Sequence, residues 1–258
     1  MGEVYRADFK DGRRFVVKVD RSSTPILERE GWMLQYLAAH SKLPIPKVIH
    51  SDPTLLVMTF LPGASNFNEQ SEIHAAELLA DLHNITAPQF GLEEDTLIGG
   101  LHQPNPWTTS WIHFFREHRL LYMARVAYDA GQLPGETLHR LEKLASRLDA
   151  WLEEPLRPSL IHGDIWSGNV LADRHRITGF LDPAIYYADP EIELAFITLF
   201  HTFGETFFQH YNELHGIRPG FWDLRRDLYN LYPLLVHVRL FGRSYLASVQ
   251  RILDRLGV

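Results

Sequence analysis

Residues 159–171 read Ser-Leu-Ile-His-Gly-Asp-Ile-Trp-Ser-Gly-Asn-Val-Leu, and this stretch decides how the rest of the chain is interpreted. An apolar run leads into a His-Gly-Asp turn, four residues separate Asp164 from Asn169, and a second apolar run follows at once. A third apolar segment, residues 177–181, ends at Asp182. Phosphoryl transfer needs one carboxylate beside the attacking hydroxyl, together with an Asn and an Asp that hold Mg²⁺. The stretch therefore predicts an ATP-dependent kinase that acts on a small molecule.

The same D-x-x-x-x-N spacing, with a later Asp, occurs in the catalytic loop of protein kinases. The simpler alternative is a tight turn with a satisfied Asp, but it leaves the Asn and the second acid unexplained. We expect His162 to belong to the scaffold rather than to carry a proton. The chain has no complete Walker A, G-x-G-x-x-G, G-x-S-x-G or H-E-x-x-H motif, and His113 and His118 are wrongly spaced for zinc. A hydrolase, a dehydrogenase and a zinc enzyme are therefore poorly supported.

The composition is that of an ordinary globular protein, with 258 residues and 45% hydrophobic side chains. A net charge of -7 argues against binding to nucleic acid. The chain has no cysteine, so disulfides and thiol catalysis are excluded. No apolar run reaches the roughly 18 residues of a membrane span, and no secretory signal is visible. We expect a cytoplasmic protein that does not bind membranes, and a monomer, with a dimer as the alternative.

The first residues predict a β-hairpin with a lysine near its end. Residues 3–9 alternate as a strand does, Asp11-Gly12 favours a tight turn, and residues 14–19 form a second strand. Lys18 stands near the end of this strand in a Val-Val-Lys run, like the kinase lysine that contacts the ATP phosphates. A lysine at a strand edge can also simply reach solvent, and the hairpin alone does not separate the two possibilities.

A helix is predicted to start at Thr24 and Pro25, because proline suits the first turn of a helix. A kinase needs a glutamate on this helix to pair with the strand lysine. We assign that role to Glu30, which lies beside an apolar face, although Glu28 is close by. Acidic residues in a first turn also suit the helix dipole without any catalytic role.

The apolar strand over residues 55–60 stops abruptly at Pro62-Gly63, which is a suitable hinge between two lobes. We therefore divide the chain into an ATP-binding N-lobe, residues 1–61, and a C-lobe with the catalytic loop, residues 62–258. Further along, the aromatic residues of the segment Trp107 to Phe115 fall at helical spacing, and most of them are expected in the core.

Several of these segments resemble the fructosamine kinase (ketosamine kinase) family of the aminoglycoside phosphotransferase-like superfamily. The His-Gly-Asp-x-x-x-x-Asn core is typical of the superfamily. The narrower resemblance rests on Trp-Ser-Gly within that core and on five other segments, namely residues 181–184, 189–195, 107–115, 89–92 and 240–242. It implies an α+β, bilobal protein-kinase-like fold, with a small antiparallel β N-lobe and a larger, mainly helical C-lobe.

The resemblance also implies roles for individual residues, with ATP and Mg²⁺ as cofactors. Asp164 would be the catalytic base, Asn169 and Asp182 would bind Mg²⁺, and Trp166 would line the sugar site. The ATP phosphates would be bound by Lys18 paired with Glu30, and adenine by the connector Met58, Thr59, Phe60 and Leu61. The implied reaction phosphorylates the 3-hydroxyl of a free or protein-bound ketosamine, a ribulosamine or fructosamine. The unstable product then sheds the sugar, which deglycates the amine.

The chain start departs from the family pattern. In the family a helix, a strand and a glycine-rich loop precede this point, and Gly2-x-Val4 resembles only the end of that loop. We therefore expect an N-terminally truncated N-lobe with weakened ATP binding. Two alternatives stay open at this point: a related kinase acting on a choline-like, homoserine-like or aminoglycoside substrate, and a nucleotide-binding form with impaired catalysis.

Overall fold

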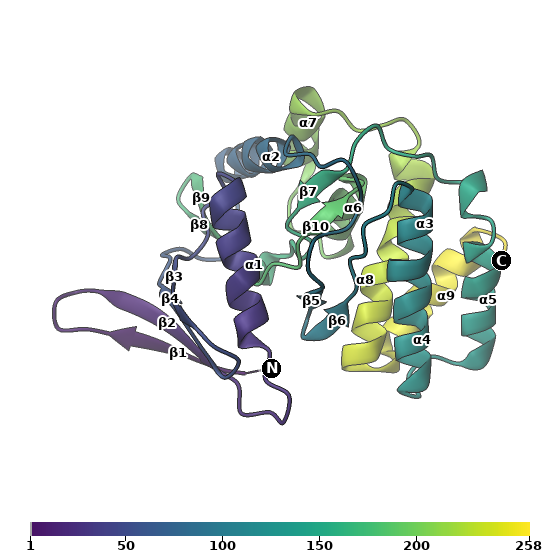
Figure 1. Ribbon diagram of the computed structural model, residues 1–258. Coiled ribbons are helices and arrows are strands. Elements are labelled where there is room, and N and C mark those ends of the chain that lie inside the picture. The colour runs from purple at the N-terminus through teal and green to yellow at the C-terminus, as the bar shows by residue number, and fades with distance from the viewer. Residues whose placement is uncertain (1) are drawn as a thin grey trace.

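A four-stranded antiparallel sheet and one long helix build the smaller lobe of this computed structural model, which describes residues 2–258 (Figure 1). The strands lie in the order β1-β2-β4-β3. Their bounds are β1 Glu3–Asp8, β2 Arg14–Val19, β3 Val48–Ser51 and β4 Leu55–Thr59. The predicted hairpin is present, and Gly12 at its turn has a φ of 86°, which glycine adopts without strain.

Helix α1 (Leu27–His40) packs against both lobes. Leu27 and Leu34 join Leu56 and Met58 of the sheet in a small apolar core. Met33 and Leu37 of the same helix, on an adjoining face, belong to the large core of the other lobe. One helix is therefore shared by two hydrophobic cores.

The start of α1 differs from the prediction at Thr24. Asp20 accepts hydrogen bonds from the backbone N–H groups of Ser22, at 2.9 Å, and Ile26, at 3.3 Å. These bonds hold the segment before the helix in a turn, so the helix begins only at Leu27. Local side-chain bonding thus outweighs the preference of proline for a first helical turn.

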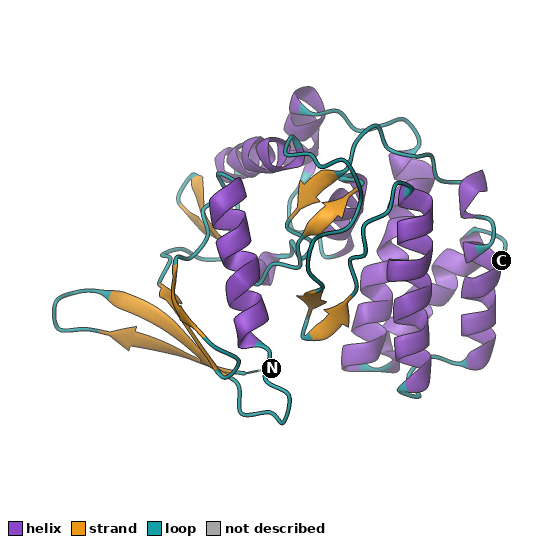
Figure 2. Ribbon diagram, in the orientation of Figure 1, coloured by secondary structure: helices purple, strands orange, loops and turns teal. Residues whose placement is uncertain are grey.

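The larger lobe is mainly helical and carries three two-stranded antiparallel sheets (Figure 2). Its helices are α2 Glu69–His83, α3 Trp111–Phe115, α4 Tyr122–Asp129, α5 Gly135–Ala145, α6 Glu191–Leu199, α7 Glu205–Leu214, α8 Arg226–Phe241 and α9 Leu246–Arg255. The paired strands are β5 Thr96–Ile98 with β6 Leu101–Gln103, β7 Ser159–Ile161 with β10 Tyr186–Ala188, and β8 Val170–Asp173 with β9 Arg176–Phe180. The α+β, two-lobed architecture confirms the expected fold class. The predicted boundary between residues 61 and 62 follows β4 directly and stays a prediction.

The aromatic residues 111–115 begin a helix that continues to Asp129 and contains a π-helical stretch in its middle. The side chain of Ser110 caps α3 by accepting the N–H of His113 at 3.1 Å, and residues 116–121 form a π-helical stretch before α4. Trp111, Phe114 and Phe115 are fully buried, as expected for a core stripe. Trp107 is 42% exposed and precedes the helix, so three of the four aromatic residues lie in the core, which confirms the expectation for most of them. Among residues 2–258, no helix has the length and apolar character needed to cross a bilayer.

Candidate active site

The catalytic loop runs from the end of β7 to the start of β8 and requires a glycine. Gly163 has a φ of 84°, and a Cβ atom there would lie 2.2 Å from the carbonyl oxygen of Ala184. The same two segments are joined by a 2.7 Å hydrogen bond from the Ala184 N–H to the carbonyl of His162. This close approach brings Asp164 and Asp182 to one cavity, which both of them line.

Asp164 and Asn169 are held together within this loop. The Asn169 Nδ2 donates to Asp164 Oδ2 at 2.9 Å and to the Asp164 carbonyl at 3.0 Å. Burial raises the pKa of Asp164 to about 7, the charge of Asp182 adds to the rise, and the hydrogen bond from Asn169 opposes it. A carboxyl group with such a pKa can take up and release a proton near neutral pH.

Lys18 joins the two lobes through two carboxylates. Its Nζ lies 2.6 Å from Glu30 Oε1 on α1 and 2.5 Å from Asp182 Oδ1 after β9. Burial would lower the pKa of Lys18, but the charges of Asp182 and Glu30 outweigh it and raise this pKa. The structure therefore brings together a lysine and two acids from three separate elements.

Glu193 holds the loop before Asp164 in place through hydrogen bonds, and this residue was not identified from the sequence. Its carboxylate accepts the backbone N–H groups of Gly163 at 2.5 Å and of His162 at 3.3 Å, and contacts His83 Nε2 at 2.9 Å. Its side chain is fully buried. The sequence contained a signal for the burial of Glu193, because an acidic residue inside the apolar run Ile-Glu-Leu-Ala of α6 is expected to be buried and paired.

Trp166 presents its indole to the cavity. A Cβ atom added to Gly168 would lie 2.4 Å from Trp166 Cη2, so the ring rests directly on the backbone of this glycine. The side chain keeps 41% of its surface exposed, and its other neighbours include Phe200, at a centroid distance of 6.3 Å. The Trp-Ser-Gly sequence thus builds a flat, exposed aromatic platform beside Asp164.

The predicted adenine connector lies apart from this cavity. Met58 is buried in the small core, and the Thr59 hydroxyl accepts the N–H of Lys47 at 2.9 Å. The Phe60 ring lies under the Arg14 guanidinium at 4.6 Å, and the Leu61 side chain packs against Gly179. A role for these four residues in adenine binding stays a prediction.

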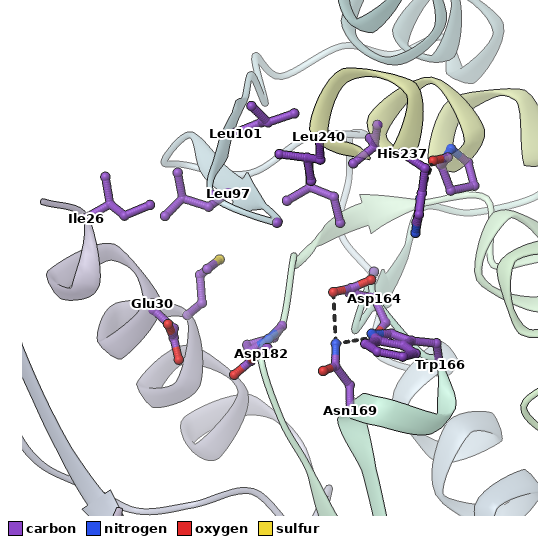
Figure 3. A pocket seen from close by; sticks show the side chains of 18 of the residues that line it. Ile26, Glu30, Leu97, Leu101, Asp164, Trp166, Asn169, Asp182, His237 and Leu240 are labelled. Carbon is purple, nitrogen blue, oxygen red and sulfur yellow. Dashed lines mark hydrogen bonds between the residues drawn. The ribbon is translucent and has the colours of Figure 1, made fainter. Parts of the chain in front are cut away.

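The cavity has a volume of about 570 Å³, within the range of small-molecule sites. Figure 3 shows Asp164, Asn169 and Trp166 at one side of it, and leucine and isoleucine side chains at another. His237 of α8 also points into it. The His237 Nδ1 donates to the Pro233 carbonyl at 2.7 Å, which leaves Nε2 as an acceptor.

Comparison with known proteins identifies the family of this chain. The family model for fructosamine kinase matches residues 1–257. This chain belongs to the fructosamine kinase family.

Relatives of this fructosamine kinase family member extend along most of its length. A probable ketoamine kinase of Synechocystis is 34% identical, and the match covers 94% of this chain and 83% of the relative. A chloroplastic protein-ribulosamine 3-kinase of Arabidopsis thaliana is 33% identical, with coverage of 95% and 76%.

Solved structures agree with the family assignment. A candidate fructosamine-3-kinase from Thermobifida fusca superposes with a TM-score of 0.88 at 30% identity, covering 97% of this chain and 88% of the other. The aminoglycoside phosphotransferase APH(4)-Ia reaches a TM-score of 0.65 at 18% identity, over 98% and 94% of the two chains, which shows a shared fold.

A kinase of this family is expected to use a divalent cation. The side-chain oxygens of Asn169 and Asp182 are suitable ligands for such an ion. The Asn169 amide nitrogen is engaged by Asp164, so its Oδ1 atom is left available as a ligand, and Asp182 lines the same cavity. Mg²⁺ in such enzymes is bound by one or two protein oxygens and completed by phosphates and water. Within residues 2–258, no group of three or more His, Cys, Asp and Glu side chains could hold a metal by itself.

Proposed function

We propose that this protein is an ATP-dependent kinase that phosphorylates the 3-hydroxyl of a ketosamine, a ribulosamine or fructosamine. The observation that carries the proposal is the cavity in which Asp164, its partner Asn169 and the Lys18–Asp182 ion pair converge. The substrate is proposed from the relatives, since the Arabidopsis protein is named a protein-ribulosamine 3-kinase.

In this proposal the sugar lies against the Trp166 indole with its 3-hydroxyl beside Asp164. The hydroxyl oxygen forms a bond to the γ-phosphorus of ATP while the bond to the β-phosphate oxygen breaks, and Asp164 accepts the proton. Asn169 fixes the orientation of the carboxyl group through its hydrogen bond. His237 Nε2 accepts a hydrogen bond from another sugar hydroxyl. The products are ADP and a ketosamine 3-phosphate, which then sheds the sugar and restores the amine.

Lys18 binds the phosphates of ATP, and Glu30 holds it in place through their 2.6 Å ion pair. Asn169 and Asp182 would hold Mg²⁺, which would neutralise part of the phosphate charge. The connector Met58 to Leu61 binds adenine. A cytoplasmic location and a monomeric state belong to the same proposal, and cell fractionation and size-exclusion chromatography test them.

A panel of acceptors measured by coupled ADP release tests the function. We expect turnover with ribulosamines or fructosamines, and none above background with choline, homoserine or an aminoglycoside. A phosphorus NMR spectrum of the product should show a sugar 3-phosphate. Absence of turnover with every ketosamine in the panel would refute the proposed function. A thermal shift with Mg·ATP but without any turnover would instead support a binding protein with impaired catalysis.

A further inference from the structure

One wall of the cavity consists of side chains that carry no hydrogen-bonding group. We call this wall the apolar pouch, and its members come from the segment before α1, from the β5–β6 hairpin and from α8. They are Ile26, Leu97, Leu101, Val236 and Leu240. Figure 3 shows four of them gathered on the side of the cavity away from Asn169.

The β5–β6 hairpin closes the pouch because its two glycines fit between the neighbouring elements. A Cβ atom at Gly99 would lie 2.7 Å from Leu240 Cδ1, and one at Gly100 would lie 3.6 Å from Ile26 Cδ1. The hairpin therefore contacts both α8 and the segment before α1. The pouch is a built surface, continuous with the cavity in which Asp164 lies.

The parts of a bound ketosamine and ATP differ in how well they suit this surface. The sugar hydroxyls would lose their hydrogen bonds with water there and gain none. The adenine is proposed to lie at the connector, residues 58–61, and none of these four residues lines the cavity. The substituent on the ketosamine nitrogen is the remaining part. The nitrogen is attached to C1, two carbons from the carbon that carries the reacting 3-hydroxyl, so its substituent leaves the sugar within the same cavity that the pouch lines.

We propose that the apolar pouch binds the substituent of the ketosamine nitrogen and makes the enzyme select ketosamines of apolar amines. This inference rests on the proposed function. An alkyl or aromatic group gains free energy by leaving water for this surface, whereas a carboxylate at the same place would lose its hydration without a partner. Exposed Phe241 also lines the cavity and adds to its apolar surface for a longer substituent.

The test compares ribulosamines of two amines of similar length, 3-methylbutylamine and 4-aminobutyrate, in the coupled ADP assay. We expect kcat/KM to be at least about tenfold higher for the apolar amine, in the range that a hydrophobic pocket provides. Leu101→Asn, which keeps the branching at Cγ but is polar, should lower this ratio about tenfold, mainly through KM. Leu240→Asn tests the same wall from another element, should the first variant fail to fold by circular dichroism.

Leu156→Asn is the matched control, because Leu156 is 90% exposed and is not among the residues that line the cavity. It should leave the ratio unchanged. Equal kcat/KM for both amines in the wild type, or an unchanged ratio in folded Leu101→Asn and Leu240→Asn, overturns the inference while the proposed function stands. A rise in KM for ATP without a change in the ratio would place adenine in the pouch and also overturn it. Absence of turnover with both ribulosamines, and with every other ketosamine, removes the proposed function and the inference together.

Discussion

At the scale of single residues, Asp164 is the proposed proton acceptor, and a hydrogen bond from Asn169 orients its carboxylate. Replacing Asp164 with Asn removes the proton acceptor but keeps the shape of the side chain. We expect kcat to fall by about 10²–10⁴-fold, while the melting temperature stays near that of the wild type. ADP release and circular dichroism measure the two quantities. A folded variant with near-normal kcat would show that Asp164 is not the base.

Gly168 matters because the Trp166 indole rests on it. A methyl group there would lie 2.4 Å from the ring, so Gly168→Ala must displace the indole from its place beside the sugar. We expect KM for the ketosamine to rise about tenfold, with a smaller effect on KM for ATP. Gly216→Ala is a control elsewhere in the chain, since a Cβ atom at Gly216 meets nothing within 4 Å, although its positive φ strains the backbone there. Equal KM values for Gly168→Ala and the wild type would argue against stacking on Trp166.

At the scale of elements, a buried arginine holds the segment that carries the β5–β6 hairpin. Arg119 is fully buried, and it donates to the Pro104 carbonyl at 2.7 Å and to Asn105 Oδ1 at 2.6 Å. Its guanidinium also lies 3.8 Å from the ring centre of Tyr186. The hairpin therefore depends on a cation whose terminal nitrogens donate to neutral acceptors and whose plane meets an aromatic face, while its Nε atom has no partner.

Arg119→Met should leave these acceptors unpaired inside the protein. We expect a loss of about 2–3 kcal/mol in the free energy of unfolding, measured by urea denaturation. Arg157→Met, at an exposed position, should change it by less than about 0.5 kcal/mol. Equal stability of the two variants would contradict this role of Arg119.

The sequence predicted those elements whose signals are local. The hairpin turn at Asp11-Gly12 and the loop around Asp164 could be located because their residues are neighbours in the chain. Glu193 and His237 could not be assigned, because their roles depend on contacts between elements that are far apart in sequence. The late start of α1 was missed because Asp20 caps a turn that no periodicity reveals. Family membership and the two-lobed fold were predicted correctly, whereas the catalytic roles still await the variants above.

At the scale of the whole molecule, Glu193 links the stability of the larger lobe to pH. Burial alone would raise the pKa of Glu193, but hydrogen bonds from His83 and the Gly163 N–H lower it below its usual value. Such a carboxylate stabilises the fold above its unfolded pKa of about 4.3, and this contribution is lost as the pH falls through the lower, folded value.

Glu193→Gln should therefore be less stable than the wild type at pH 7 by about 1.5–3 kcal/mol, the range for hydrogen bonds to a charged group. The difference should shrink as the pH falls below about 4, because the wild type then loses the same charge. Chemical denaturation between pH 3 and 7 measures both effects, with the exposed Glu153→Gln as a control. A constant difference across this range would contradict the assignment.

The sharing of α1 between two cores has a consequence for control of the enzyme. The helix is also tied to the larger lobe by the Arg29–Glu94 ion pair at 3.0 Å and by the hydroxyls of Tyr36 and Tyr187 at 3.3 Å. Swinging it outward would break both contacts and expose Met33 and its neighbours, so Glu30 stays beside Lys18 without any activating signal. A mutation that loosens this helix lowers folding and turnover together.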